Sequence, residues 1–127
     1  MLYWGKHLVM DVRKCAPDTI RSRQIIDAFT RQLVRDIKMV PYGEPQIQMF
    51  GSGNKKGYTL VQLIETSNIC AHFAEETNDM YLDVFSCKDF EARKVEKLVR
   101  SFFKPSMVSA RVLYRDAALP PIDIHMK

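Results

Sequence analysis

The residues best suited to chemistry are few and lie far apart in the sequence. They include three cysteines, Cys15, Cys70 and Cys87, and three histidines, His7, His72 and His125. Zinc sites need closely spaced Cys and His ligands, and no such spacing occurs, so the pattern predicts no metal site. Cys70 and His72 are two residues apart and would share a face of a strand. A thiol nucleophile, Cys70 or Cys87 paired with His72, is therefore one hypothesis, although a lone histidine more often has a structural role.

A second candidate centre is Ser67, which lies between two strand-like runs at a place where the chain must reverse. Thr59 and His72 lie on these neighbouring runs, and we expect both side chains to reach Ser67. A serine in a tight, strained turn with polar helpers nearby can attack the carbonyl group that precedes it.

The elements that must position these residues follow from the pattern of apolar residues. Alternation predicts strands at 6–13, 46–50, 57–65, 68–75, 80–87 and 106–115. Helical spacing predicts a helix over about 19–38, with Asp18 as its N-cap, and a second helix over 90–103. The stretch 41–45, which contains two prolines and a glycine, predicts a loop. We expect the tail after Asp116 to be irregular.

The size of the chain and this order of elements define the expected fold class. The sequence has 127 residues and is 46% hydrophobic, which suits one compact core, so we predict a single domain over 1–127. Runs of strands with two amphipathic helices predict an α+β two-layer sandwich, with a largely antiparallel sheet and both helices on one face. The other face of the sheet would then carry the chemistry or a partner.

Composition and charge argue against several classes of protein. The net charge is +4, but the basic residues are mixed with acidic ones along the helices, so no nucleic-acid partner is expected. No apolar run is long enough to span a membrane, and the first residues do not resemble a signal peptide. An odd number of cysteines without a CxxC pair favours free thiols and a reducing compartment. We therefore expect a cytoplasmic protein without a membrane partner.

The middle of the sequence carries a combination of motifs more specific than any single residue. It contains Gly57-Tyr58-Thr59, then LVQLIETSNICAH, then YLDVFSC, and WGKHLVMDVRKC comes earlier. In this order the motifs resemble the pyruvoyl-dependent S-adenosylmethionine decarboxylase proenzymes of bacteria and archaea, over most of residues 4–115. Members of this family decarboxylate S-adenosylmethionine and so supply the aminopropyl donor for polyamine synthesis.

The resemblance implies self-cleavage between Thr66 and Ser67, into a β chain 1–66 and an α chain 67–127. In the family mechanism the serine hydroxyl attacks the preceding carbonyl and converts the amide into an ester. The ester eliminates, and the resulting dehydroalanine hydrolyses to a pyruvoyl group, the cofactor. Decarboxylation of an α-amino acid needs an electron sink, and the pyruvoyl ketone is such a sink.

The resemblance also assigns roles to other residues. His72 matches the histidine that assists processing, Thr59 stands where the family usually has a processing serine, and Cys87 matches the proton donor in decarboxylation. Glu65, Thr66 and Phe50 are candidate substrate-binding residues, Phe50 because it is the aromatic residue nearest the position where relatives stack on adenine. The family resemblance further implies a homodimer of cleaved protomers with sites near the subunit interface.

Two other functions remain open, because Thr66 and Asn68 stand where the family usually has Glu and His. The first is a pyruvoyl-dependent decarboxylase of arginine or ornithine. Its cationic substrate would need carboxylates, and four follow the cleavage site: Glu75, Glu76, Asp79 and Asp83. The second is a cleavage-defective relative that binds a ligand or a partner subunit without catalysis.

Overall fold

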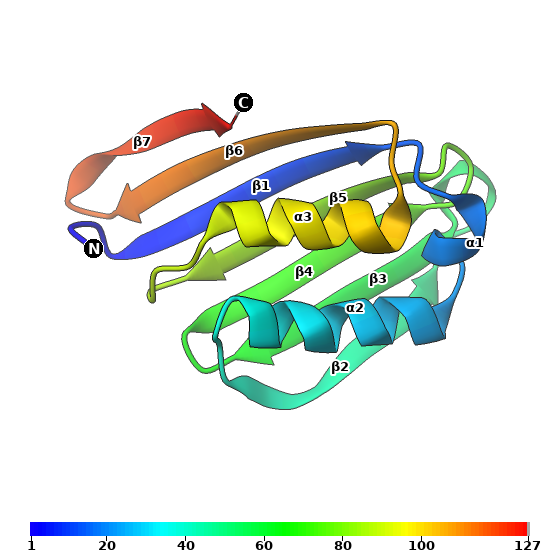
Figure 1. Cartoon of the computed structure of the whole chain (residues 1–127), viewed down its shortest axis with the longest axis horizontal. Coiled ribbons are helices and arrows are strands. Elements are labelled where there is room, and N and C mark those ends of the chain that lie inside the picture. The colour runs from blue at the N-terminus through cyan, green and yellow to red at the C-terminus, as the bar shows by residue number, and fades with distance from the viewer. Residues whose placement is uncertain (127) are drawn as a thin grey trace.

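A seven-stranded antiparallel sheet forms the centre of the molecule (Figure 1). The computed structural model describes residues 1–126 and places the strands in the order β2-β3-β4-β5-β1-β6-β7. The strands are β1 Gly5–Arg13, β2 Pro41–Phe50, β3 Gly57–Ile64, β4 Ser67–Ala74, β5 Asp79–Ser86, β6 Met107–Asp116 and β7 Leu119–Met126. Every neighbouring pair is antiparallel.

The two long helices, α2 (Arg23–Asp36) and α3 (Ala92–Phe103), lie side by side on one face of the sheet (Figure 1). A short helix, α1 (Pro17–Ile20), precedes α2, and a 3-10 turn, η1 (Gly53–Lys55), precedes β3. The two helices meet each other through the rings of Phe29 and Phe103, which pack edge to face with centroids 4.9 Å apart. Phe103 also meets the sheet, with its ring centroid 5.6 Å from that of Phe73 on β4. The α+β two-layer fold predicted from the sequence is confirmed.

The predicted helix over 19–38 is wrong in its first part. The chain forms α1 and α2 separately, because Ser22 has an extended backbone (φ −107°, ψ 111°) between them. The Ser22 hydroxyl accepts a hydrogen bond from the Ile25 N–H at 3.2 Å and so caps α2. Asp18, the predicted cap, lies in the first turn of α1, whose N-cap is Ala16.

Two segments predicted to be irregular are strands at the edges of the sheet. The predicted loop at 41–45 belongs to β2, and the tail after Asp116 contains β7. Proline cannot donate a backbone hydrogen bond, but an edge strand tolerates it on its unpaired side. A bulge between Tyr42 and Gln46 takes up the extra residues of β2, and Gly43 there has a φ of +75°.

The two faces of the sheet differ because successive side chains of a strand point in opposite directions. On β4, Ile69, Ala71 and Phe73 are buried under the helices. The intervening side chains, including Cys70 and His72, point to the face without helices, which we call the open face. No helix among residues 1–126 covers the open face, and it carries exposed apolar side chains such as Leu63 and Tyr81.

Candidate active site

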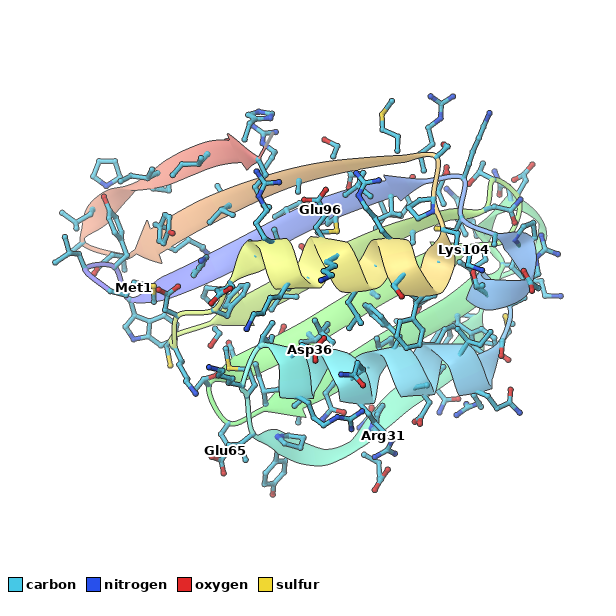
Figure 2. All side chains as sticks on the ribbon, in the orientation of Figure 1. Met1, Arg31, Asp36, Glu65, Glu96 and Lys104 are labelled. Carbon is cyan, nitrogen blue, oxygen red and sulfur yellow. The ribbon has the colours of Figure 1, made fainter. Side chains whose placement is uncertain are left out.

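The predicted cleavage site lies at the hairpin that joins β3 and β4. Ile64 pairs with Ser67, so Glu65 and Thr66 form a two-residue turn, and Glu65 extends from this end of the sheet (Figure 2). Ser67 is the first residue of β4 and is half-buried. The turn is tight, as expected, and none of residues 65–67 has a positive φ or a cis peptide bond.

Thr66 is held at both its carbonyl and its side chain. Its carbonyl oxygen accepts a hydrogen bond from the Cys87 N–H at 3.1 Å. Its hydroxyl lies 2.7 Å from the hydroxyl of Ser86 and 3.4 Å from the sulfur of Met39. The Cys87 N–H therefore points at the carbonyl that Ser67 would attack, which is where negative charge would develop in that reaction.

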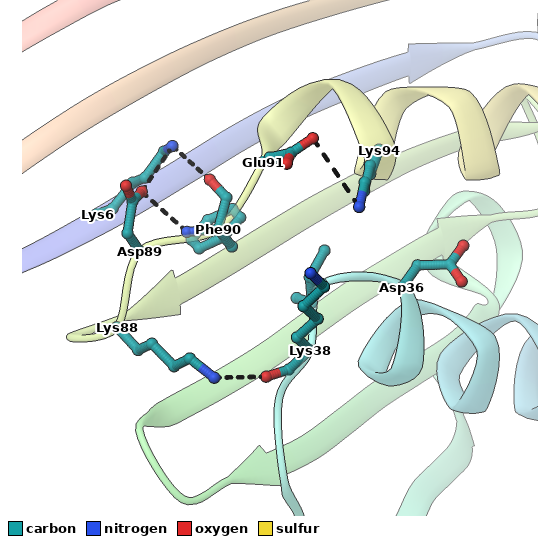
Figure 3. A pocket seen from close by; sticks show the side chains of 9 residues that line it. Lys6, Asp36, Lys38, Lys88, Asp89, Phe90, Glu91 and Lys94 are labelled. Atoms are coloured by element: carbon teal, nitrogen blue, oxygen red, sulfur yellow. Dashed lines mark hydrogen bonds and ion pairs between the residues drawn. The ribbon is translucent and has the colours of Figure 1, made fainter.

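Cys87 follows β5 directly, and its side chain is exposed. The loop behind it is fixed by the buried Lys6, whose ammonium donates to Asp89 Oδ1 at 3.1 Å and to the Phe90 carbonyl (Figure 3). Partial burial would raise the pKa of Asp89, but the hydrogen bond and charge of Lys6 outweigh it, so the pKa lies below its usual value. Lys88 ties the same loop to the Lys38 carbonyl at 2.7 Å.

The side chains of Thr59 and His72 contact each other but do not reach Ser67 of the same chain. The prediction that both reach Ser67 is therefore wrong for a single chain. They form a cross-strand pair on the open face, with Thr59 Oγ1 3.3 Å from His72 Nδ1. His72 is five residues beyond Ser67 on β4, which is about 16 Å along a strand. An odd separation also places the two side chains on opposite faces of the sheet.

Phe50 also lies away from the cleavage site of its own chain. It ends β2 and pairs with Gly57, the first residue of β3, whereas the hairpin follows Ile64 at the other end of that strand. The separation is seven residues, or about 23 Å along the strand. Thr59, His72 and Phe50 therefore belong to the half of the sheet remote from the hairpin.

An aromatic group that the sequence did not reveal lies on the open face at the Ser67 end of the sheet. Phe85 on β5 contacts Trp4 and His7, with ring centroids 5.8 Å and 5.5 Å apart, and the Arg115 guanidinium lies 4.6 Å from its centroid. Trp4 is 59% exposed, so its ring is accessible to a ligand. What brings these residues together is the antiparallel pairing of β1 with β5, which places the start of β1 beside the end of β5.

The thiol-nucleophile hypothesis is not supported by the surroundings of the cysteines. Burial, and then the charge of Asp83, raise the pKa of the Cys70 thiol, which disfavours the thiolate. Its sulfur contacts the Asn68 side chain, and the His72 ring contacts Thr59. Cys15 lies in the core, where burial raises its pKa to about 12.

Residues 1–126 hold neither a cluster of metal ligands nor a membrane-spanning helix. Within this part of the chain, no group of three or more His, Cys, Asp or Glu side chains is placed to hold a metal ion. Among its helices, none is long and apolar enough to cross a membrane.

Comparison with solved structures identifies the class of fold. The chain resembles the crystal structure of the adenosylmethionine decarboxylase from Aquifex aeolicus, with a TM-score of 0.77 and 21% sequence identity. The match covers 90% of this chain and 92% of that one. At this identity the match establishes the fold alone, and that fold is the same α+β arrangement.

Comparison of sequences identifies the family. The family model for S-adenosylmethionine decarboxylase matches residues 6–116. Two curated relatives are named S-adenosylmethionine decarboxylase proenzyme. The one from Clostridium botulinum strain Langeland is 26% identical over 97% of this chain and 100% of its own length. The one from Archaeoglobus fulgidus is 26% identical over 87% of this chain and 96% of its own. The chain belongs to the S-adenosylmethionine decarboxylase family.

Proposed function

We propose that this protein is a proenzyme that cleaves itself between Thr66 and Ser67 and then decarboxylates S-adenosylmethionine with the pyruvoyl group formed from Ser67. The observation that carries the proposal is the hydrogen bond from the Cys87 N–H to the Thr66 carbonyl, 3.1 Å long. It polarises the one carbonyl that directly precedes Ser67. The names of the relatives, which are proenzymes, support a chain that is processed before it acts.

The cleavage would begin with the Ser67 hydroxyl. As its oxygen bonds to the Thr66 carbonyl carbon, the carbon–nitrogen bond breaks and the hydroxyl proton passes to the amine, leaving an ester. Loss of the Ser67 Cα proton then breaks the Cβ–oxygen bond. The products are a free carboxylate on Thr66 and a dehydroalanine, which water converts to the pyruvoyl group with release of ammonia. The chain itself thus supplies all the atoms of its cofactor except the new ketone oxygen.

Several residues would serve the second reaction, the decarboxylation. The pyruvoyl ketone supplies an electron sink for the carbon that loses carbon dioxide. Cys87 would hold the proton that this carbon takes up, since its thiol is exposed beside the hairpin and its backbone N–H is already used on Thr66. Glu65 and Thr66 at the hairpin turn would contact the substrate.

The working unit would be a homodimer, because one chain does not bring Thr59 and His72 to its own Ser67. A two-fold arrangement with open faces together would place the remote half of one sheet over the hairpin of the other. The Ser67 side chain, which points to the helix-covered face of its own strand, would then have to turn toward the open face to meet the partner's histidine. It would also cover the exposed side chains of Leu63 and Tyr81. Phe50, in the remote half, would arrive at the partner's site in the same way.

We expect complementation between two inactive variants made in the same cell with different tags. A His72→Ala chain alone should cleave slowly, and a Ser67→Ala chain should not cleave. In a mixed dimer, the Ser67→Ala protomer still supplies Thr59 and His72, so the His72→Ala chain should be cut at nearly the normal rate. Electrophoresis of the tagged fragments measures this.

The matched control partner carries both Ser67→Ala and His72→Ala and should give no rescue. If the His72→Ala chain is cut equally slowly beside either partner, the histidine does not act across a dimer.

The aromatic group on the open face favours the adenosyl substrate over a linear amino acid. Adenine needs a flat apolar platform, and the exposed ring of Trp4, beside Phe85 at the Ser67 end of the sheet, would provide one. Two of the carboxylates considered for binding arginine or ornithine already have partners. Asp79 accepts a hydrogen bond from the Lys14 N–H at the end of β5 that is opposite to Ser67. Asp83 is paired with His7 at 3.0 Å.

The substrate is tested by release of labelled carbon dioxide from S-adenosylmethionine, arginine and ornithine with the same cleaved protein. We expect release from S-adenosylmethionine alone, and a KM raised about two- to ten-fold by Trp4→Ala, since stacking on the ring is lost. Carbon dioxide release from arginine or ornithine, without release from S-adenosylmethionine, would contradict the proposed substrate but not the proposed self-cleavage. A protein that never cleaves and releases nothing would favour the non-catalytic binding relative.

A further inference from the structure

Ser86, the last residue of β5, has a hydroxyl group that the reactions described above do not use. Its side chain is fully buried, although it lies at the end of the sheet beside the hairpin. The oxygen accepts a hydrogen bond from the Lys88 N–H at 3.0 Å and lies 2.7 Å from the Thr66 hydroxyl. A buried hydroxyl is costly unless it is hydrogen-bonded, and Ser86 meets that need through the Lys88 N–H and through Thr66, the residue at the scissile bond.

Ser86 and its neighbour Cys87 hold Thr66 at two points. Ser86 bonds the side chain of Thr66, and the Cys87 N–H bonds its carbonyl at 3.1 Å. Contacts from two consecutive residues therefore hold both the side chain and the carbonyl of Thr66 at the end of β5. Ser86 also pairs with Ser67 across β4 and β5, so the attacking residue lies in the same register.

We propose that Ser86 is a positioning residue for self-cleavage. By bonding the Thr66 hydroxyl, it keeps the Thr66 carbonyl on the Cys87 N–H, which stabilises the negative charge that forms as the Ser67 oxygen bonds to that carbon. Ser86 touches no reacting atom and acts through Thr66. The inference rests on the proposed self-cleavage and adds a requirement for two hydroxyl groups, one on residue 66 and one on residue 86.

The particular residue at position 66 supports this role. This chain has a threonine before Ser67, and its hydroxyl is matched by the hydroxyl of Ser86. Met39 completes the enclosure, with its sulfur 3.4 Å from the Thr66 hydroxyl and 3.8 Å from that of Ser86. The contact is therefore enclosed, and competition from water is reduced.

The test measures the rate at which newly made, uncleaved protein separates into two fragments. Ser86→Ala and Thr66→Val should each slow cleavage by about three- to ten-fold, which is the effect of one net hydrogen bond. Ser86→Thr and Thr66→Ser, which keep a hydroxyl, should cleave at nearly the normal rate. The double variant Ser86→Ala/Thr66→Val should be no slower than either single one, because both remove the same contact.

A matched control separates positioning from stability. Thr30 is also fully buried, and its hydroxyl bonds the Ile26 carbonyl at 2.7 Å within α2. Thr30→Val should lower the melting temperature as Ser86→Ala does and yet cleave at the normal rate.

Normal cleavage of Ser86→Ala and Thr66→Val, beside a Ser67→Ala chain that stays whole, would overturn the role of Ser86 and leave self-cleavage standing. A multiplicative slowing in the double variant would also overturn it. If the unsubstituted protein never cleaves, the proposed function fails and this inference fails with it.

Discussion

Replacing Ser67 by alanine is expected to leave the chain whole and to abolish decarboxylation. The methyl side chain has no oxygen to attack the Thr66 carbonyl, so neither the ester nor the pyruvoyl group can form. Denaturing electrophoresis should show a single species in place of two fragments of similar size. The loss should be complete, because the pyruvoyl group can form only from a residue 67 whose side chain carries the attacking oxygen.

The control for this experiment is Ser52→Ala. Ser52 is an exposed serine before η1, and its side chain makes no capping hydrogen bond, so this variant should cleave as the unsubstituted protein does. Fragments 1–66 and 67–127 from the Ser67→Ala chain would show that cleavage has another cause.

Replacing Cys87 by alanine is expected to separate the two reactions. Cleavage should proceed largely normally, because the contact with the Thr66 carbonyl comes from the backbone N–H, which alanine retains. Turnover should fall by about a hundred-fold or more, the usual contribution of a positioned proton donor. The rate of carbon dioxide release per cleaved chain is the quantity to compare.

Cys70→Ala is the matched control for the loss of a thiol. Cys70 lies on the open face with a raised pKa and no contact with the hairpin, so its removal should spare turnover. If Cys87→Ala keeps full activity on the true substrate, the thiol is not the proton donor. If Cys70→Ala is the inactive variant, the thiol-nucleophile hypothesis returns.

The elements that sequence reasoning placed well are those with strong alternation or helical spacing. The central strands and α3 are of this kind, because each buries a continuous set of apolar side chains. The first half of the edge strand β2, residues 41–45, and the whole of β7 could not be placed in this way. Their prolines signal a break, and only their position at the edge of the sheet makes them tolerable. The break between α1 and α2 depends on one serine, Ser22, whose capping role is visible only with its backbone angles.

The active-site residues also divide into those that the sequence indicated and those that only the pairing of the strands brings to the site. The family resemblance indicated Ser67 and Cys87, and the ends of β4 and β5 that carry them lie side by side, because these strands pair in register through Ser67 and Ser86. The sequence also suggested that His72 reaches Ser67, but five residues along a strand is too far and an odd number changes the face. Ser86 and Phe85 carried no signal of their own, since their importance comes from which strand ends adjoin.

The intact mass of the purified, unsubstituted protein tests the central claim most directly. We predict two chains, one with the mass of residues 1–66 ending in a normal carboxylate. The other should match residues 67–127 less one ammonia, because a pyruvoyl group has replaced the amino-terminal serine. A single chain of 127 residues that persists after long incubation would contradict the account, as would a 67–127 fragment that begins with an intact serine.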